Sequence, residues 1–338
     1  MNRKIIVILL LLGGTVLSAV LYFLYASNTG SFSGKKYLYI KTGAAYEQVL
    51  KSVKDSSLVQ DMGSFERMAS WLHLSNNLHP GRYEVKEGMS NYQIISMLKK
   101  GRQSVVKLVL NKLRTKNDII RKLSSQLEPD SLAWSQLFTD ATFLAKNQID
   151  SNQIQSLILP NTYEFYWNVT PEKVLDRLTD YTNTFWNEER NAKAAKLKLT
   201  RAQIITIASI VEEETNKKNE KPTIASVYIN RYRIGMNLGA DPTVKFAVGD
   251  FKLKRILTVH TQIASPYNTY KYVGLPPGPI CTPSETSIDA VLHAAETKYL
   301  FFCAKEDFSG YHNFASTYAE HLVNAKKYQA ALNARGIR

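Results

Sequence analysis

The sequence predicts an α+β fold that follows one N-terminal transmembrane helix. An uninterrupted apolar run near the start predicts that helix, and residues 37–104 contain short strand patterns followed by helical patterns. The second half carries longer apolar stripes at helical spacing, separated by loops rich in proline and glycine. A chain of 338 residues with 44% hydrophobic content can form two globular domains in addition to a membrane anchor.

The apolar run over residues 5–25 is long enough to cross a hydrocarbon core about 30 Å thick. Arg3 and Lys4 precede it, so the positive-inside rule keeps residues 1–4 in the cytoplasm and places the rest of the chain outside. A cleaved signal peptide is the competing interpretation, but its apolar core is usually shorter, and residues 26–28 form a poor cleavage site. We therefore expect a retained, single-pass anchor.

The charge and the cysteines limit the classes of partner and cofactor. A total of 43 Lys and Arg against 29 Asp and Glu gives a net charge of +14, which suits anionic lipids, acidic polymers or nucleic acid. The basic residues are spread along the chain without a nucleic-acid-binding motif, so nucleic acid is not an expected partner. Cys281 and Cys303 lack metal-ligand spacing, and His312 and His321 lack HExxH spacing, so no metal or other cofactor is expected. Whether the cysteines pair is left open.

A small domain is expected over residues 37–104, after a flexible linker at 26–36 that is rich in serine and glycine. Its expected elements are a strand at 37–40, a helix at 46–53, a strand and turn at 81–90, and a helix at 91–100 closed by Gly101. The strand, turn and helix from 81 to 100 resemble a LysM module, which binds polymers that contain N-acetylglucosamine. The resemblance implies a sugar-binding subdomain, and a structural βα unit without a ligand is the alternative.

Residues 105–155 carry mixed helical patterns without recognisable chemistry, and we interpret them as a connecting region. A second domain of mixed α+β character is expected over residues 156–338. The candidate site residues lie in this second domain.

A helix that ends in three glutamates is the first candidate for chemistry. Thr200 and Gln203 have capping-box spacing, and apolar residues then recur on one helical stripe until Glu212, Glu213 and Glu214. At about 100° per residue, Glu213 points away from the stripe and the other two glutamates lie on its margins. A carboxyl at the edge of an apolar surface tends to keep its proton, as a general acid must. The alternative is a solvated acidic helix end, although acidic residues there oppose the helix dipole.

A second helix is expected from Pro222 to the stop at Gly235, and it carries Asn230. After it, Asp241 and a proline are typical of a helix N-cap followed by the first helical position. Capping is the expected role of Asp241, with a role in a site as the alternative.

The segment from Ser265 to Ile280 is rich in proline and glycine, which predicts a rigid, non-helical loop. Its side chains Tyr267, Asn268 and Tyr270 offer ring faces and amide hydrogen bonds to a sugar. A structural crossover is equally compatible with this pattern.

Taken together, these motifs resemble the endolytic murein transglycosylase (MltG/YceG-like) family. The matching segments are Ala208–Thr215, Val227–Arg231, Asp241–Thr243, Tyr267–Tyr270 and Gly274–Ile280, with His312, Phe314, Thr317, Glu320 and His321 matching the terminal motif. The resemblance implies a single-pass enzyme of the inner membrane, without a cofactor, whose catalytic domain lies in the periplasm. It implies cleavage of nascent peptidoglycan strands, which ends strand elongation. It also selects Glu214, followed by a small hydroxyl residue, as the catalytic carboxyl, with Glu212 as the alternative.

The implied reaction cuts the bond between N-acetylmuramic acid and N-acetylglucosamine and leaves a 1,6-anhydro end. Glu214 would protonate the glycosidic oxygen and then accept the proton of the muramic acid 6-hydroxyl. One carboxyl suffices because the nucleophile belongs to the substrate. The substrate-binding residues that the resemblance implies are Asn230, Asp241, Tyr267, Asn268 and Tyr270. The implied partners are peptidoglycan glycan strands and membrane lipid, with cell-wall synthases as further candidates.

The sequence departs from the family pattern at two places. Gly239-Ala240 stands where the family usually has a glutamine and a small residue, and Thr282-Pro283-Ser284 stands where it usually has Asn-Pro-Gly. Both departures concern substrate contacts rather than the general acid. Two alternatives to a transglycosylase are a non-catalytic peptidoglycan-binding membrane scaffold and a hydrolase that uses a second carboxylate such as Asp241.

Overall fold

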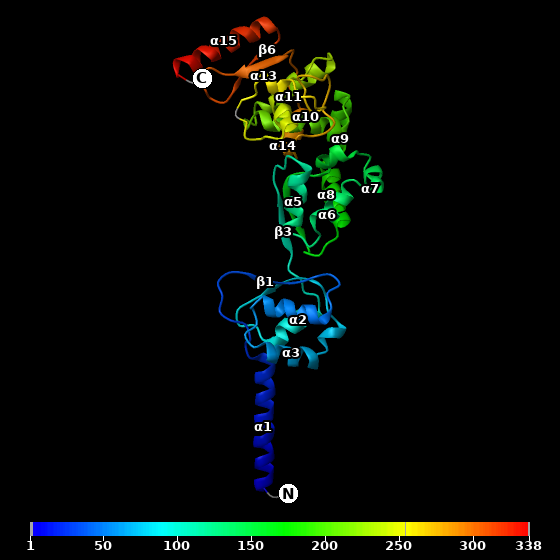
Figure 1. The fold of residues 1–338 in the computed structure, drawn as a ribbon, viewed down its shortest axis with the longest axis vertical. Coiled ribbons are helices and arrows are strands. Elements are labelled where there is room, and N and C mark those ends of the chain that lie inside the picture. Colours follow the sequence, from blue (N-terminus) through cyan, green and yellow to red (C-terminus); the bar gives the residue numbers. More distant parts are fainter. Residues whose placement is uncertain (1–2, 254, 337–338) are drawn as a thin grey trace. The chain divides into compact units, whose positions relative to one another are not determined.

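The computed structural model describes residues 3–253 and 255–336, which form two compact units (Figure 1). Unit 1 comprises Met1–Leu108, Ser124–Asp130 and Glu164–Thr170; unit 2 comprises Val109–Leu123, Ser131–Tyr163 and Pro171–Arg338. Helices and short strands occur in both units, which confirms the α+β class.

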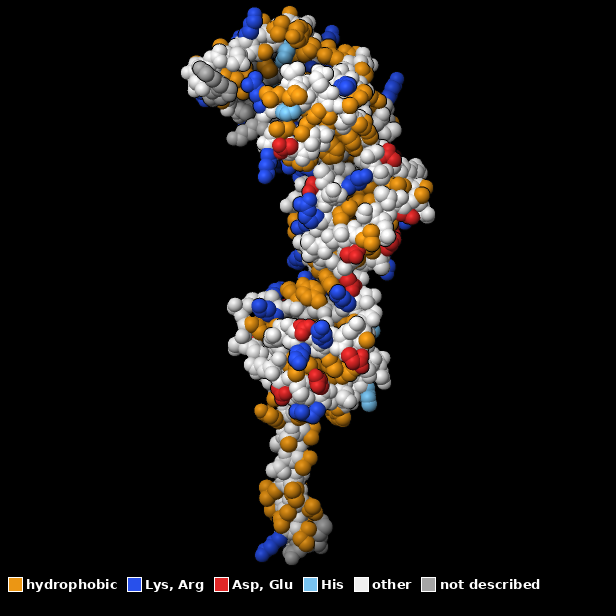
Figure 2. Space-filling view, in the orientation of Figure 1, with side chains coloured by type: hydrophobic (Ala, Val, Ile, Leu, Met, Phe, Trp, Pro, Cys, Tyr) orange, Lys and Arg blue, Asp and Glu red, His pale blue; other side chains and the backbone are white. Residues whose placement is uncertain are grey.

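The first helix, α1 (Arg3–Tyr25), has the length and composition of a membrane span. None of its residues is buried in the protein, and hydrophobic side chains line the face visible in Figure 2. At its end, the ring of Tyr25 meets the edge of Tyr92 with 5.9 Å between centroids. The predicted N-terminal apolar helix is therefore confirmed, and its last turn contacts Tyr92.

The chain that follows α1 is hydrogen-bonded to later residues of unit 1, so the expected flexible linker is wrong for its first residues. Asn28 is buried; its backbone N–H donates to Met89 O at 2.9 Å, and its side-chain amide donates to Asp61 O and Asn91 Oδ1 at 2.8 and 2.6 Å. Thr29 forms a β-bridge with Val59. Serine and glycine content indicated flexibility, but hydrogen bonds to distant residues order this stretch.

Unit 1 is built on an antiparallel pair of strands covered by helices on one face. The elements are β1 (Lys36–Ile40), α2 (Tyr46–Asp55), α3 (Met62–Trp71), η1 (Leu74–Asn76), β2 (Gly81–Val85) and α4 (Asn91–Lys99). Leu38 and Tyr83 point from the strands into a core shared with Phe65 and Ile94 of the helices. The predicted strands and the helices at 46–53 and 91–100 are confirmed, whereas α3 was not predicted.

A second two-stranded sheet joins β3 (Val106–Leu110) to β4 (Asn161–Phe165). Between these strands the chain forms α5 (Lys116–Ser124), α6 (Ser131–Leu137), α7 (Ala141–Lys146) and η2 (Ser151–Leu157). The helical patterns predicted in this region are present as short helices.

The rest of unit 2 is mainly helical. Its elements are α8 (Pro171–Phe185), α9 (Glu188–Leu197), α10 (Arg201–Glu214), α11 (Lys221–Arg233), α12 (Asp241–Val248), α13 (Thr258–Thr261), α14 (Glu285–Leu292), β5 (Phe301–Ala304), β6 (His312–Ala315) and α15 (Tyr318–Ala334). β5 and β6 form an antiparallel hairpin that contacts α15. The predicted helices at 200–214 and 222–235 correspond to α10 and α11.

Helix α10 lies at the centre of this unit. The predicted capping box starts it, because Thr200 Oγ1 accepts from Gln203 N and Gln203 Oε1 accepts from Thr200 N. Every residue from Ile204 to Val211 is buried, since α9, α11, α12, α14 and η2 all contact α10. The expectation of a single buried stripe is therefore wrong. A helix enclosed on all sides holds the glutamates at its C-terminus in a fixed position.

Candidate active site

The three consecutive glutamates at the end of α10 have three different environments. Glu212 Oε2 accepts hydrogen bonds from Lys221 Nζ at 2.9 Å, from Ser284 Oγ at 2.7 Å and from Ser287 Oγ. Burial opposes ionisation, but these hydrogen bonds outweigh it and hold the pKa of Glu212 below its usual value. Glu212 is therefore an ionised anchor between α10, α11 and α14.

Glu213 faces basic residues that follow β3. Its carboxylate pairs with Lys112 Nζ at 2.8 Å and with Arg114 Nη2 at 3.1 Å. Both cations are partly exposed, and the glutamate is largely buried. Glu213 thus fixes the segment after β3 to the end of the central helix.

Glu214 is the member of the three that is suited to proton transfer. Its Oε1 accepts a hydrogen bond of 2.5 Å from the hydroxyl of Tyr228 on α11. Burial raises the pKa of Glu214 to about 7; the hydrogen bond from Tyr228 and the charge of Lys245 oppose this rise, and the charge of Asp241 adds to it. A carboxyl with a pKa near 7 is populated in both protonation states at neutral pH, as a group that must donate and then accept a proton requires.

Asp241 is the neighbour that carries a second carboxyl. The hydroxyl of Tyr270 donates to Asp241 Oδ1 at 2.6 Å, and burial, followed by the hydrogen bond to Asp241, raises the pKa of Tyr270. The predicted N-cap role of Asp241 is wrong, because Ala240 is the N-cap of α12 and no side chain caps that end. The carboxylate is directed to Tyr270 instead of the first amides of the helix.

Arg231 supports this arrangement from α11. Its Nε donates to Leu300 O at 2.5 Å and its Nη1 donates to Leu238 O at 2.6 Å, while burial lowers its pKa. Gly239 lies beside it with φ +56°, and a Cβ at that glycine would lie 3.2 Å from Arg231 Nη1. The departure from the family pattern at Gly239 thus has a structural explanation, since a larger residue would be strained and would crowd the guanidinium.

Asp241 and Tyr270 are the predicted binding residues that the structure brings close to Glu214. The amide of Asn230 instead donates to Thr297 O and Tyr299 O at 2.9 and 3.0 Å. These bonds tie α11 to the strand region that follows α14. Its role in substrate binding stays a prediction.

The remaining two predicted residues contact the rest of the protein rather than open solvent. Asn268 is buried and its amide donates to Thr261 O and Ile263 O at 2.9 and 2.8 Å. Tyr267 lies against Phe246 with 4.5 Å between ring centroids, and burial raises its pKa to about 12. The loop is non-helical, as expected, and at Gly278 a Cβ would lie 2.2 Å from the backbone oxygen of Asn152.

Tyr228, Arg231 and Lys245 were not assigned to the site from the sequence. Tyr228 lies in the helix predicted from Pro222 to Gly235, and the structure buries it. A buried tyrosine needs a hydrogen-bond partner for its hydroxyl. That requirement could have indicated, from the sequence, a polar group beside Tyr228. Among residues 3–253 and 255–336, no group of three or more His, Cys, Asp or Glu could hold a metal ion, and both cysteines are free thiols.

Comparison with known proteins identifies the family. Residues 38–327 match the model of the YceG-like family, which covers most of the chain. The chain belongs to the YceG-like family. The motif resemblance noted in the sequence is thereby confirmed, and the segments around Glu214, Asp241 and Tyr270 all lie within the matched range.

Several relatives of this YceG-like chain are endolytic murein transglycosylases by name. The one from Bacillus subtilis (strain 168) is 28% identical over 313 residues, which cover 87% of this chain and 85% of the relative. The one from Streptococcus pneumoniae serotype 2 (strain D39 / NCTC 7466) is 25% identical over 307 residues, or 80% of this chain. The matched region spans only 55% of the streptococcal protein.

A crystal structure of a YceG-like protein from Listeria monocytogenes has a similar fold. It superimposes with a TM-score of 0.58 at 25% sequence identity, covering 86% of this chain and 98% of the other. The family assignment thus agrees at the level of sequence and of structure.

Proposed function

We propose that this YceG-like protein is an endolytic lytic transglycosylase. It cleaves the bond between N-acetylmuramic acid and N-acetylglucosamine in nascent peptidoglycan strands, forms 1,6-anhydro ends and so ends strand elongation. The observation that carries the proposal is the environment of Glu214, whose pKa is raised to about 7 by burial. The names of the relatives support the same substrate class.

Glu214 performs both proton transfers in this mechanism. Tyr228 donates to Oε1, so Oε2 is the oxygen that carries the transferable proton. Oε2 protonates the glycosidic oxygen as the bond to the anomeric carbon breaks, and the carboxylate then accepts the proton of the 6-hydroxyl as that oxygen bonds to the anomeric carbon. No water is consumed, because the leaving oxygen gains the proton and the nucleophile is intramolecular.

Asp241 and Tyr270 support this chemistry from the same side of the site. The charge of Asp241 raises the pKa of Glu214 and stabilises positive charge that develops on the sugar ring. The hydroxyl of Tyr270 fixes its orientation through the bond of 2.6 Å. In this proposal Asn230, Tyr267 and Asn268 shape the glycan site, through the backbone and loop contacts described above.

The proposal includes the location and the domain organisation. Arg3 and Lys4 orient α1 with its N-terminus in the cytoplasm, so that the catalytic domain, residues 156–338, lies in the periplasm at the inner membrane. Residues 37–104 form a LysM-like domain that binds glycan, and residues 105–155 connect it to the catalytic domain. Cell-wall synthases are partners, because the substrate is a nascent strand.

A hydrolase is the second candidate function, because Asp241 supplies a second carboxyl close enough to affect Glu214. Mass spectrometry of glycan strands digested by the full-length protein in detergent and ¹⁸O-labelled water separates the two. The transglycosylase yields anhydro ends without label, and a hydrolase yields labelled reducing ends.

Two substitutions test which glutamate performs the proton transfers. Glu214→Gln is expected to abolish cleavage, while Glu213→Gln, which changes the adjacent carboxylate, is expected to retain it. Cleavage by Glu214→Gln at the wild-type rate would disprove the proposed role, and binding of peptidoglycan by a wild-type protein that cleaves nothing would favour the scaffold.

A further inference from the structure

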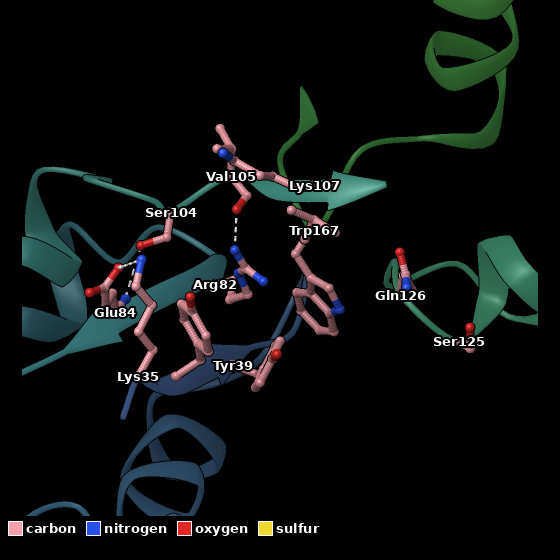
Figure 3. A pocket seen from close by; sticks show the side chains of 12 residues that line it. Lys35, Tyr39, Arg82, Glu84, Ser104, Val105, Lys107, Ser125, Gln126 and Trp167 are labelled. Carbon is pink, nitrogen blue, oxygen red and sulfur yellow. Dashed lines mark hydrogen bonds and ion pairs between the residues drawn. The ribbon is translucent and has the colours of Figure 1, made fainter. Parts of the chain in front are cut away.

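A groove lies on the face of the β1–β2 sheet that the helices of unit 1 leave uncovered (Figure 3). It has a volume of about 830 Å³, which is in the range of sites that bind small molecules. The outward side chains of both strands line it, together with residues 104–107 and Trp167. All of these residues belong to unit 1.

Strand alternation explains why these side chains gather there. Leu38 and Tyr83 point into the core, so the residues next to them on each strand point outward. The register pairs Tyr37 with Glu84 and Tyr39 with Arg82. Two tyrosines therefore lie opposite one cation and one anion on a single open face.

The aromatic part of the groove is preformed. The rings of Tyr39 and Trp167 lie 5.1 Å apart at 67°, and the side chain of Tyr39 is 43% exposed. In Figure 3 both rings stand on one side of Arg82. The face of an aromatic ring carries negative potential, which attracts the weakly positive C–H groups of a pyranose ring.

The charged part of the groove has an excess of cations. Lys35 pairs with Glu84 and Lys107 with Glu164, each at 3.9 Å, and both lysines are exposed. Arg82 stacks on Tyr37 at 4.1 Å and donates to Val105 O, but its Nε is buried and has no hydrogen-bond partner among the described residues. Arg82 lines the groove, and a planar guanidinium suits a carboxylate ligand.

We propose that this groove is an accessory site for peptidoglycan, in which a sugar ring packs on Tyr39 and Trp167 and a stem-peptide carboxylate binds Arg82. The identity of the polymer rests on the proposed function, since the site around Glu214 acts on the same molecule. The groove lies on the opposite face of the sheet from the helices of unit 1. Holding the polymer at a second site raises the effective concentration of glycan at the catalytic carboxyl.

Co-sedimentation with purified sacculi tests the proposal. The full-length protein in detergent carries Glu214→Gln, so that cleavage does not alter the pellet, and Trp167→Ala or Arg82→Gln is added. Each addition is expected to weaken binding about tenfold, as loss of a central anchor does. Tyr166→Ala is the matched control, because Tyr166 is an exposed aromatic residue next to Trp167 that does not line the groove. It should bind as the parent does.

The outcomes distinguish failure of the groove from failure of the proposed function. Unchanged binding in both groove variants, or an equal loss with Tyr166→Ala, overturns the accessory site. If the groove variants bind phosphatidylglycerol vesicles less tightly but bind sacculi as the parent does, the accessory site is also overturned. The groove is then assigned to lipid. If Trp167→Ala does not fold, Tyr39→Ala replaces it, since Tyr39 is largely exposed. A wild type that forms no anhydro ends would refute the transglycosylase but would leave this binding result intact.

Discussion

Replacing Glu214 by glutamine is expected to stabilise the protein at high pH and to leave its stability unchanged at low pH. The pKa of Glu214 is about 7 in the folded protein, against a usual value of 4.5. The folded state thus binds this proton more tightly than the unfolded state does. This tighter binding adds to the free energy of unfolding. The added stability is fully present below pH 4.5 and is lost as the pH rises through 7.

The structure sets the size of the effect. A difference of about 2.5 units corresponds to about 3 kcal/mol above pH 8, since one unit is about 1.4 kcal/mol. Glutamine mimics the protonated carboxyl and keeps an oxygen that accepts from Tyr228, so it avoids this loss. The melting temperature should rise by about 6 to 12 °C at pH 8.5, at about 2 to 4 °C per kcal/mol.

Thermal unfolding of the full-length protein in detergent at pH 4.5 and pH 8.5 measures this difference. Glu212→Gln is the control, and it should destabilise the protein instead of stabilising it. Glu212 is ionised, so removing its charge leaves the buried Lys221 without a counter-charge. That change should cost about 3 kcal/mol at pH 8.5. If Glu214→Gln melts at or below the wild-type temperature at pH 8.5, the account of the Glu214 environment is refuted.

Three further predictions concern Asp241, Tyr228 and Asn230. Asp241→Asn removes a charge that raises the pKa of Glu214, so the alkaline limb of the kcat/KM profile should move to lower pH; a profile that does not move would contradict this. Tyr228→Phe removes the hydrogen bond that lowers the same pKa, so that limb should move to higher pH and kcat should fall by about tenfold or more. A wild-type profile and rate would show that the bond is unimportant. Asn230→Ala leaves two backbone carbonyls without donors, so calorimetry should show a loss of about 1 to 3 kcal/mol with little change in KM; a raised KM with unchanged stability would assign Asn230 to the substrate.

Local rules in the sequence were sufficient for much of the fold. The capping box at Thr200 located the start of α10, and the apolar residues that follow gave its extent. The α4 helix was predicted from its closing Gly101, and the structure shows in addition that Ser90 Oγ accepts from Gln93 N at its start. The α3 helix was missed, although Asp61 accepts from Ser64 N and forms a cap that the sequence could have revealed.

Features that depend on distant residues were not predictable from local patterns. Asn28 looked like part of a linker, but its order depends on Asp61 and Asn91 far along the chain. Asp241 has the sequence context of a cap, but its carboxylate bonds to Tyr270, 29 residues later. Local spacing placed two of the three glutamates at the margin of the apolar stripe, and only the tertiary partners separate the anchored Glu212 from the protonatable Glu214.

A direct titration of the Glu214 carboxyl tests whether burial raises its pKa to about 7. The carboxyl carbon of glutamates labelled with ¹³C can be followed by NMR from pH 4 to pH 9 in the full-length protein, and the Glu214→Gln variant assigns the signal that disappears. A midpoint near pH 7, moving down in Asp241→Asn, is the expected result. A midpoint near 4.5 would show that Glu214 is an ordinary ionised glutamate, and the proposed general acid would then be wrong.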